Sequence, residues 1–447
     1  MKDLKKRLLL DCTYVYTSEL NTGIQRVVRN VALNSKEVCE NLNVDLELII
    51  LNDGKIKKID FIPHNKMAKV TNTFLFFKNI YHKIRKLILF IFPFDFVKHF
   101  LFNAKEEFGL RYLVEELIIK PLSLKLPFSK DKRFDLEEIV LKKEDILLLI
   151  DSTWHNEIYK SLNLAKEKEV KIFTVIYDII PITHPEFCDE SLSVVFKQWL
   201  NNITKYSDGY MAISNSVKED TIDYFKNKLN YKPDYFDYFI LGSNVSKKNI
   251  NVDIIRNELK DIYQENKKTY IIVSTIEARK NHIQVLRVFE ELWENDFDSN
   301  LIIIGKIGWK VDDLVKKIVN HKLLNKKLFM FNDIDDNELQ YIYNSSDVLI
   351  FPSIIEGFGL PIIEGLNNNL KVIASDTPIH REVGKNLVTY FDLNSDKSLK
   401  KKISETEDSL ITNDKINIPT WKESTTELIE KVLKFNNQID MDRKIND

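Results

Sequence analysis

Residues 351–364 read Phe351-Pro352-Ser353-Ile354-Ile355-Glu356-Gly357-Phe358-Gly359-Leu360-Pro361-Ile362-Ile363-Glu364. This stretch decides the fold, because it joins a strand to a helix through a glycine-rich turn. The apolar run at 348–351 predicts a buried strand. Pro361 suits a first helical position, where its missing N–H is not needed. Glu356 then lies in the turn, and Glu364 lies about one turn into the helix.

The turn has the features of a ligand site. Open α/β sheets bind ligands outside the carboxyl ends of their strands, where Glu356 falls. Gly357 and Gly359 let the backbone approach a ligand closely, and the N–H groups near Phe358 and Gly359 can hold phosphate. Two separated carboxylates around free N–H groups suit a nucleotide sugar. The alternative is a tight turn with an acidic residue that the helix dipole favours.

A second strand-to-helix turn reads Ser274-Thr275-Ile276-Glu277-Ala278-Arg279-Lys280-Asn281-His282. The helix after it is predicted to bury one face, formed by Ile283, Leu286, Phe289 and Trp293. Arg279 and Lys280 stand at the positive end of this helix, which is the wrong sign for the helix dipole. A bound diphosphate would resolve that conflict and stabilise a leaving nucleotide. The alternative is a pair of solvated loop cations.

Short apolar runs alternate with helical patterns along the chain, which predicts parallel sheets with helices on both faces. Each half predicts its own doubly wound sheet. The expected domains are 1–245, 246–420 and a final helix at 421–447 that ends the second domain or packs back onto the first. The expected strands are 7–12, 44–51, 146–151, 171–177 and 210–213 in the first half, and 270–275, 301–305, 328–331, 348–351, 371–374 and 388–391 in the second.

Composition narrows the function classes. The chain has 447 residues, is 44% hydrophobic and has a net charge of -2, which argues against bulk nucleic-acid binding. Cys12, Cys39 and Cys188 lack metal or disulfide spacing, so a reducing compartment is expected. Asp11 cuts the first apolar run too short for a signal peptide. The most apolar stretch, 87–102, is too short and charged to span a bilayer. A cytoplasmic protein is expected.

The segment 64–133 departs from the strand and helix alternation. It holds 14 Lys or Arg against 6 Asp or Glu, and it is dense in aromatic residues. Cations among aromatic residues suit the interface of an anionic membrane, which would place the protein peripherally on the inner face. The alternative is a helical insertion that packs on the first domain.

Together, the two turns resemble the retaining GT-B glycosyltransferases of family 4. The matching stretches are 277–282, 347–364 and Ser375-Asp376-Thr377-Pro378-Ile379-His380-Arg381-Glu382-Val383. The resemblance implies two facing Rossmann-like domains with a cleft between them. It also implies that Arg279 and Lys280 contact the donor diphosphate beside the backbone of Gly357, Phe358, Gly359 and Leu360, that Glu364 holds the ribose, and that Glu356 touches the donor sugar. The family usually needs no metal or other cofactor.

The first half resembles the family more loosely. Thr22-Gly23-Ile24-Gln25-Arg26-Val27-Val28-Arg29-Asn30 is similar to the glycine loop and first helix of bacterial members. Gly23 would let a phosphate or acceptor approach, and Arg26 either reaches the cleft or is a surface cation. Thr22 and Gln25 also fit a helix capping box.

Residues 177–187 end a hydrophobic strand and offer the first domain's candidate for catalysis. Many relatives carry His-Asp where Tyr177-Asp178 stands, so no histidine role is expected there. Asp178 is the candidate contact to the acceptor, or else a turn cap. His184 is a weaker candidate for the same site. Ser216 with Glu219 predicts a helix cap, and Ser214 is a reserve candidate.

The function hypothesis is a retaining glycosyltransferase that moves a sugar from a nucleotide sugar, with GDP-mannose favoured, to a saccharide or lipid-linked oligosaccharide acceptor. The setting would be bacterial surface polysaccharide synthesis. Two rivals stay open: a nucleotide-sugar epimerase or hydrolase, and a scaffold without activity. Asp333-Ile334-Asp335 matches a metal motif of another fold, but Asp335 and Glu338 fit a capping box better. No metal site is expected.

Overall fold

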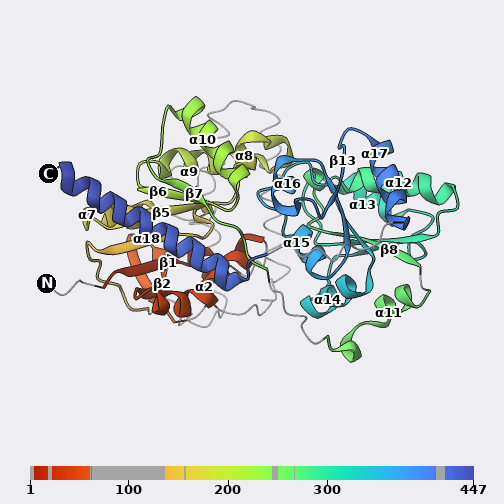
Figure 1. The fold of residues 1–447 in the computed structure, drawn as a ribbon, viewed down its shortest axis with the longest axis horizontal. Helices are drawn as coiled ribbons and strands as arrows, with labels where there is room; N and C mark the ends of the chain where they lie inside the picture. The colour runs from red at the N-terminus through yellow and green to blue at the C-terminus, as the bar shows by residue number, and fades with distance from the viewer. Residues whose placement is uncertain are drawn as a thin grey trace, which may run out of the picture.

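The structure is a computed structural model that describes residues 5–18, 23–60, 62, 136–155, 158–243, 250–265, 267–408 and 418–446. Thr22 and the segment 64–133 lie outside the described residues, so the predictions for them stay predictions. Two α/β lobes lie side by side, each built on its own sheet (Figure 1). None of the described helices is long and apolar enough to cross a membrane.

The N-terminal lobe holds a seven-stranded sheet with the order β3-β2-β1-β4-β5-β6-β7. All neighbouring strands are parallel except β2 and β3, which form a hairpin. Every residue of β4 and β5 is buried, as expected for central strands covered on both faces. The strands are β1 (Arg7–Asp11), β2 (Asp45–Asn52), β3 (Lys55–Ile59), β4 (Asp145–Leu149), β5 (Lys171–Ile176), β6 (Gly209–Ala212) and β7 (Phe236–Tyr238).

The C-terminal lobe holds a six-stranded, fully parallel sheet with the order β10-β9-β8-β11-β12-β13. The predicted strands of both lobes are therefore confirmed within two residues at each end, and β3 and β7 are additional. The strands of this lobe are β8 (Lys268–Val273), β9 (Ser299–Ile304), β10 (Leu328–Phe331), β11 (Val348–Phe351), β12 (Lys371–Ser375) and β13 (Thr389–Phe391).

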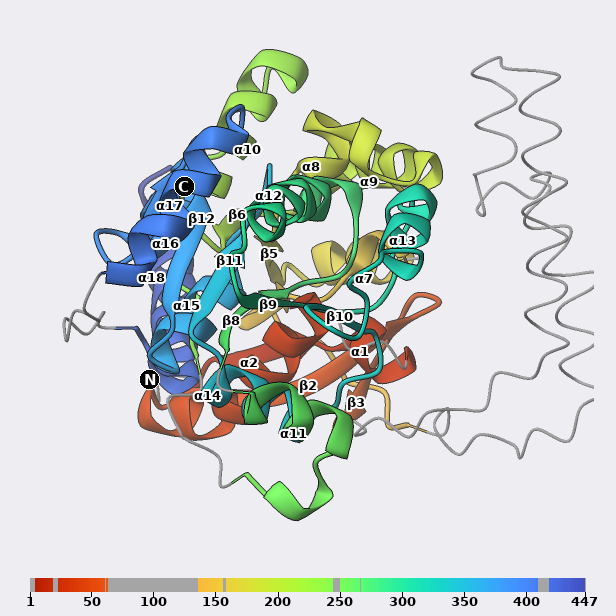
Figure 2. The same cartoon turned by 90° about the vertical axis from the view of Figure 1, so that its right-hand side faces the viewer.

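Helices cover both sheets, as the two views in Figures 1 and 2 show. In the N-terminal lobe they are α1 (Thr13–Thr17), α2 (Gly23–Asn41), η3 (Thr153–His155), α7 (Tyr159–Glu167), α8 (Ile180–Thr183), η4 (Pro185–Phe187), α9 (Glu190–Ile203) and α10 (Asn215–Leu229). From Val252 onward they are η5 (Val252–Ile254), α11 (Asn257–Gln264), η6 (Ala278–Lys280), α12 (His282–Glu294), α13 (Asp312–Val319), α14 (Asp336–Ser345), α15 (Leu360–Asn367), α16 (Pro378–Gly384), α17 (Asp396–Asp408) and α18 (Trp421–Asn446).

The strand orders fix where ligands can bind. In the C-terminal sheet the chain moves outward from β8 through β9 to β10, and then returns to start again at β11 on the other side of β8. The loops that follow β8 and β11 therefore leave the sheet in opposite directions and open a crevice between them. The N-terminal sheet has the corresponding point between β1 and β4.

Two stretches of chain, which lie side by side, connect the lobes. Ser243 forms a parallel bridge with Thr420, and a Cβ at Gly242 would lie 2.5 Å from Trp421 Cα, so only glycine fits there. The last helix, α18, then lies across the N-terminal lobe beside α2 (Figure 1). Its Leu428 and Val432 are fully buried, so this helix is part of the core of the N-terminal lobe.

Candidate active site

Two charged loops meet at the switch point of the C-terminal sheet. The first loop leaves β8 and passes through η6 into α12, and it carries Arg279 and Lys280. The second leaves β11 and turns at Gly359, whose φ of 105° favours glycine, into α15. Pro361 is the second residue of α15, one position later than predicted, and still lies in its first turn. Because β8 and β11 are paired, the two loops start at the same edge of the sheet.

Glu356 joins both cations in one ion cluster. Arg279 Nη1 donates to Glu356 Oε2 at 2.9 Å, and Lys280 Nζ donates to Glu356 Oε1. Arg279 Nε also donates to Glu277 Oε2 at 3.1 Å. The exposed fractions of the Glu356, Lys280 and Arg279 side chains are 9%, 10% and 21%. Arg279 and Lys280 were predicted to contact the donor diphosphate, and Glu356 the donor sugar. In the structure these three side chains bind one another.

The two cations hold Glu356 in its ionised state, whereas Lys280 itself is pushed toward its neutral form. Burial alone would raise the pKa of Glu356, but Arg279 and Lys280 outweigh it and keep this pKa well below its ordinary value. Burial and the charge of Arg279 lower the pKa of Lys280. Two carboxylates, Glu277 and Glu356, therefore balance the two cations.

The first turn of α15 has no side-chain cap, because the residue before it is Gly359. Phe358 beside it is buried. The N–H groups at this end carry the positive end of the helix dipole toward the turn that contains Glu356. An anion between Lys280 and α15 would meet positive charge from both.

The N-terminal lobe closes directly onto the Glu356 loop. A Cβ at Gly357 would lie 2.2 Å from the Tyr177 carbonyl oxygen, and Ser214 Oγ donates to the Gly357 carbonyl at 2.9 Å. The Tyr177 hydroxyl donates to the Ile150 carbonyl at 2.7 Å, so its ring turns into the core of the N-terminal lobe. Ser214 also caps α10, where the sequence analysis had chosen Ser216. That assignment was wrong.

Asp178 lies opposite the ion cluster on the N-terminal lobe. Its Oδ1 accepts from the Ile180 N–H at 3.0 Å, so it caps a turn. Burial raises its pKa, and the positive charge of Arg279 opposes that rise while the charge of Glu356 adds to it. The carboxyl group is therefore both a turn cap and a near neighbour of the ion cluster.

Glu364, one turn into α15, is bound from both lobes. Tyr343 of α14 donates to its Oε2 at 2.8 Å, and Arg26 of α2 donates to its Oε1 at 2.5 Å. Arg26 therefore reaches across to the C-terminal lobe. Gly23, at the start of α2, has no atom of the described residues within 4 Å of the position of a Cβ. None of the described residues therefore requires glycine at this position.

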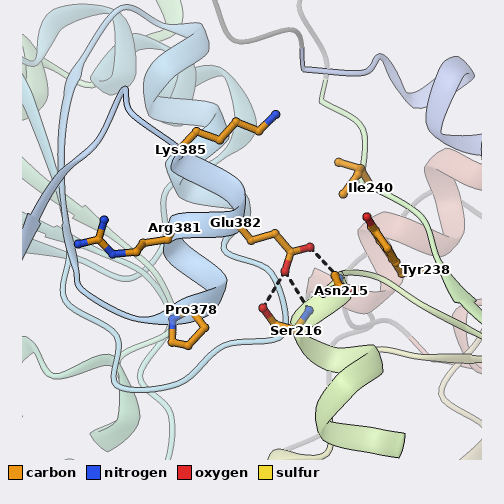
Figure 3. Close-up of a pocket in the computed structure, with 8 residues that line it drawn as sticks. All are labelled: Asn215, Ser216, Tyr238, Ile240, Pro378, Arg381, Glu382 and Lys385. Atoms are coloured by element: carbon orange, nitrogen blue, oxygen red, sulfur yellow. Dashed lines mark hydrogen bonds between the residues drawn. The ribbon is translucent and has the colours of Figure 1, made fainter.

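A separate cavity of about 630 Å³ lies at another part of the junction (Figure 3). Glu382 of α16 crosses it and accepts from the Asn215 N–H at 2.6 Å, the Ser216 N–H at 2.9 Å and the Ser216 hydroxyl at 2.7 Å. Lys385 and Arg381 line the side that belongs to α16 (Figure 3). The true partner of Ser216 is thus Glu382, a contact between distant residues that no local motif indicates.

Two further predictions have a plain outcome. The capping box of Asp335 and Glu338 is confirmed at the start of α14. Ile283 is exposed, so its assignment to the buried face of α12 was wrong; that face is formed by residues that include Val285 and Leu286. The described residues contain no group of three or more His, Cys, Asp or Glu side chains that could hold a metal ion.

Two buried carboxyl groups at the switch point of the N-terminal sheet were not among the predicted site residues. Asp11 ends β1 and accepts from the Thr13 N–H at 3.0 Å; Asp151 follows β4 and accepts from the Val15 N–H at 2.7 Å. Burial, with the charge of Asp151, raises the pKa of Asp11 to about 7. Burial likewise raises the pKa of Asp151 to about 6. Each of these carboxyl groups follows an apolar strand run, and that pattern could have identified them as site candidates.

The chain is similar to known glycosyltransferases. Residues 255–417 match the model of the family described as "Glycosyl transferases group 1". The chain is 31% identical over 314 residues to the serotype-specific mannosyltransferase WbdA of Escherichia coli, covering 66% of this chain and 38% of that protein. It is 27% identical over 233 residues to the O-antigen chain mannosyltransferase RfbU of Salmonella typhimurium, covering 52% of this chain and 60% of that protein.

The fold has a solved counterpart. The crystal structure of a glycosyltransferase from Rickettsia africae superposes with a TM-score of 0.51 at 16% identity, and the match covers 99% of this chain and 98% of that one. The two-lobe architecture is therefore the GT-B fold, as predicted. The chain spans well under half the length of WbdA. The match at 255–417 relates the C-terminal lobe to the group 1 glycosyltransferase family.

Proposed function

We propose that the protein is a retaining glycosyltransferase that transfers mannose from GDP-mannose to a saccharide acceptor. The observation that carries this proposal is the ion cluster of Arg279, Lys280 and Glu356. It lies at the β8/β11 switch point beside the first turn of α15 and opposite Asp178 of the other lobe. Cations, helix N–H groups and carboxylates on facing lobes are the groups that a nucleotide sugar and an acceptor require.

The donor diphosphate would replace Glu356 as the partner of the two cations. Arg279 and Lys280 then neutralise the phosphate charge, which grows as the bond to the sugar breaks. The N–H groups of Gly359 and Leu360 add the positive end of α15. Glu356, released from the cations, is free to accept hydrogen bonds from the sugar hydroxyls. The ion cluster therefore keeps both the cations and the carboxylate positioned before the donor arrives.

The nucleoside would lie toward Glu364. Its carboxylate is fixed by Tyr343 at 2.8 Å and is the natural acceptor for ribose hydroxyls. Arg26 holds the other oxygen of this carboxylate, so a ribose that uses both oxygens has to compete with Arg26. Donor binding thus alters a contact between the lobes as well as the ion cluster.

The reaction would proceed on one face of the sugar. The bond between the anomeric carbon and the phosphate oxygen breaks, and the acceptor oxygen forms a new bond from the same side. The departing phosphate takes the acceptor proton, so no protein nucleophile is needed. Asp178 would orient the acceptor hydroxyl, and closure of the lobes would exclude competing water. Cations and N–H groups would replace a divalent metal ion.

The names of the relatives support the proposed donor and setting. WbdA and RfbU carry mannosyltransferase in their names, and RfbU acts on the O-antigen chain. We therefore favour mannose as the sugar, a surface polysaccharide as the product, and a lipid-linked oligosaccharide as the natural acceptor. The basic segment at 64–133 would hold the protein at the inner face of the membrane where such an acceptor lies.

The test is a thermal-shift panel of GDP, UDP, dTDP and ADP, followed by incubation of GDP-mannose with α-linked mannotriose. We expect GDP to raise the melting temperature most, because a ligand that binds only the native state stabilises it. We also expect an elongated α-linked product by NMR, with EDTA making no difference. Donor turnover that does not need acceptor would favour the hydrolase or epimerase. Absence of any nucleotide response would favour the scaffold.

A further inference from the structure

The loop between β9 and α13 crosses from the C-terminal lobe to the N-terminal lobe. Trp309 Nε1 donates to the Phe187 carbonyl at 2.8 Å. Lys310 Nζ donates to the Glu186 carbonyl at 2.7 Å and to the Cys188 carbonyl at 2.8 Å. All three acceptors are main-chain groups of the segment that follows α8, the helix that begins two residues after Asp178. The two lobes are thus joined beside the candidate active site.

This loop also lies directly against the ion cluster. Ile307 forms a parallel bridge with Ile276, and the Gly308 N–H donates to the Ile276 carbonyl at 2.9 Å. A Cβ at Gly308 would lie 2.6 Å from Glu277 Cγ, and Glu277 binds Arg279. The loop therefore packs on the partner of the cation that we assign to the diphosphate.

The buried thiol of Cys188 provides a second sign that these groups converge. Burial raises its pKa to about 11, and the charges of Asp178, Arg279, Glu277 and Lys310 all act on it. Asp178, Arg279 and Glu277 belong to the proposed site and its ion cluster, and Lys310 belongs to the crossing loop. The loop, the segment around Cys188 and the ion cluster thus surround one small region.

Trp309 is unusual because it is exposed while its polar atom is satisfied. Its exposed fraction is 43%, whereas the other four tryptophans are buried or partly buried. The bond from Nε1 to the Phe187 carbonyl fixes the indole edge against the N-terminal lobe. The remaining exposed surface is apolar ring. Across the junction, His184 stacks on Phe187 with ring centroids 6.1 Å apart and planes at 11°.

We propose that Trp309, together with the stacked His184 and Phe187, forms a binding subsite for a sugar ring of the acceptor, next to the ion cluster. Sugar rings present weakly positive C–H groups, which are attracted to the negative face of an aromatic ring. A fixed indole at the edge of the site would hold the acceptor chain so that its terminal hydroxyl points toward Asp178. This subsite rests on the proposed function, because it needs a saccharide acceptor.

The competing explanation is that Trp309 only clamps the lobes together through its N–H. Two substitutions separate these roles. Trp309→Ala removes both the ring and the N–H, whereas Trp309→Phe keeps an aromatic face and removes only the N–H. Val319→Ala, at the far end of α13, removes an exposed apolar side chain outside the junction and serves as the matched control.

Kinetics provide the first test. We expect Trp309→Ala to raise KM for mannotriose about fivefold, which is within the range for loss of one aromatic stacking contact, while KM for GDP-mannose stays unchanged. Trp309→Phe should restore most of the lost acceptor affinity, and Val319→Ala should behave as the wild type. Equal loss in Trp309→Phe and Trp309→Ala would establish the clamp and overturn the subsite, as would an unchanged KM in Trp309→Ala.

Fluorescence provides a second test that needs no donor turnover. Because Trp309 is the exposed tryptophan, bound mannotriose should change the emission and protect it from iodide quenching. Trp309→Phe should lose both responses, and Val319→Ala should keep them. The same responses in Trp309→Phe, or none in the wild type at saturating mannotriose, would overturn the subsite. Failure of the proposed function differs, because the wild type would then transfer no sugar even if mannotriose protects Trp309.

Discussion

Replacing Glu356 by glutamine tests the ion cluster, because it removes one charge and keeps the shape of the side chain. Glu356 is almost fully buried and binds both Arg279 and Lys280. Removing one partner of a buried ion pair costs about 3–5 kcal/mol, because the other partner keeps a charge without compensation. Arg279 retains Glu277, so we expect the lower end of that range, about 3 kcal/mol.

That loss is large enough to appear in a melting curve. For a domain of 150–250 residues, 1 kcal/mol shifts Tm by roughly 2–4 °C, so Glu356→Gln should lower the melting temperature of the C-terminal lobe by about 6–12 °C. Differential scanning calorimetry near neutral pH measures this change. Glu338→Gln is the matched control, because Glu338 is a buried carboxylate of the same lobe that binds Arg256 at 2.6 and 2.8 Å. It should lose comparable stability.

The two variants should respond differently to a nucleoside diphosphate. In Glu356→Gln the cations have lost the carboxylate that competes with phosphate, so GDP should raise the melting temperature by more than in the wild type. In Glu338→Gln the GDP response should equal that of the wild type. An unchanged melting temperature in Glu356→Gln, or the same GDP response in both variants, would refute the reasoning.

Three other substitutions test the junction and the buried ionisable groups. Gly357→Ala places a Cβ 2.2 Å from the Tyr177 carbonyl oxygen, so it should prevent close contact of the lobes. We expect turnover to fall at least about tenfold. Normal turnover together with an unchanged radius of gyration by X-ray scattering would contradict this. Burial lowers the pKa of His282 to about 3. Between that pH and about 6.5 the unfolded chain therefore binds more protons than the native protein, so the free energy of unfolding falls as the pH falls through this window. In urea titrations, His282→Gln should lose up to about 1.4 kcal/mol per pH unit of this dependence. Parallel pH profiles of the variant and the wild type would exclude a contribution from His282. Asp11 has the opposite effect: because its pKa is raised, the native state keeps a proton up to about pH 7, and the stability of the wild type falls as the pH rises from about 4 to 7. In the same titrations, Asp11→Asn should gain stability relative to the wild type over that range. A difference in unfolding free energy that stays constant with pH would contradict this.

The sequence predicted the sheets well, because fully buried parallel strands are continuous apolar runs. The strand β4, with all five residues buried, is an example. The two strands that were missed lie at the edges of the N-terminal sheet. β3 reads Lys-Ile-Lys-Lys-Ile, which is rich in charge, and pairs antiparallel to β2, and β7 has only three residues. The Asp53-Gly54 turn, with φ of 45° and 81°, was a usable hairpin signal for β3.

The charged loops were also predictable, since glycines and ionisable residues between a strand and a helix mark the carboxyl edge of a sheet. Their partners were not predictable. The pairing of Lys280 with Glu356 depends on β8 lying next to β11, which is a property of strand order. The contacts of Arg26 with Glu364 and of Ser216 with Glu382 depend on how the lobes meet. No local pattern encodes such long-range contacts.

The most direct test of the central claim is a crystal structure of the protein with GDP bound. The account predicts diphosphate oxygens within hydrogen-bond distance of Arg279 and Lys280 and at the first turn of α15, the ribose at Glu364, and Glu356 released from both cations. GDP bound elsewhere, for example in the cavity that Glu382 crosses, or GDP bound while Glu356 still holds Arg279 and Lys280, would contradict it.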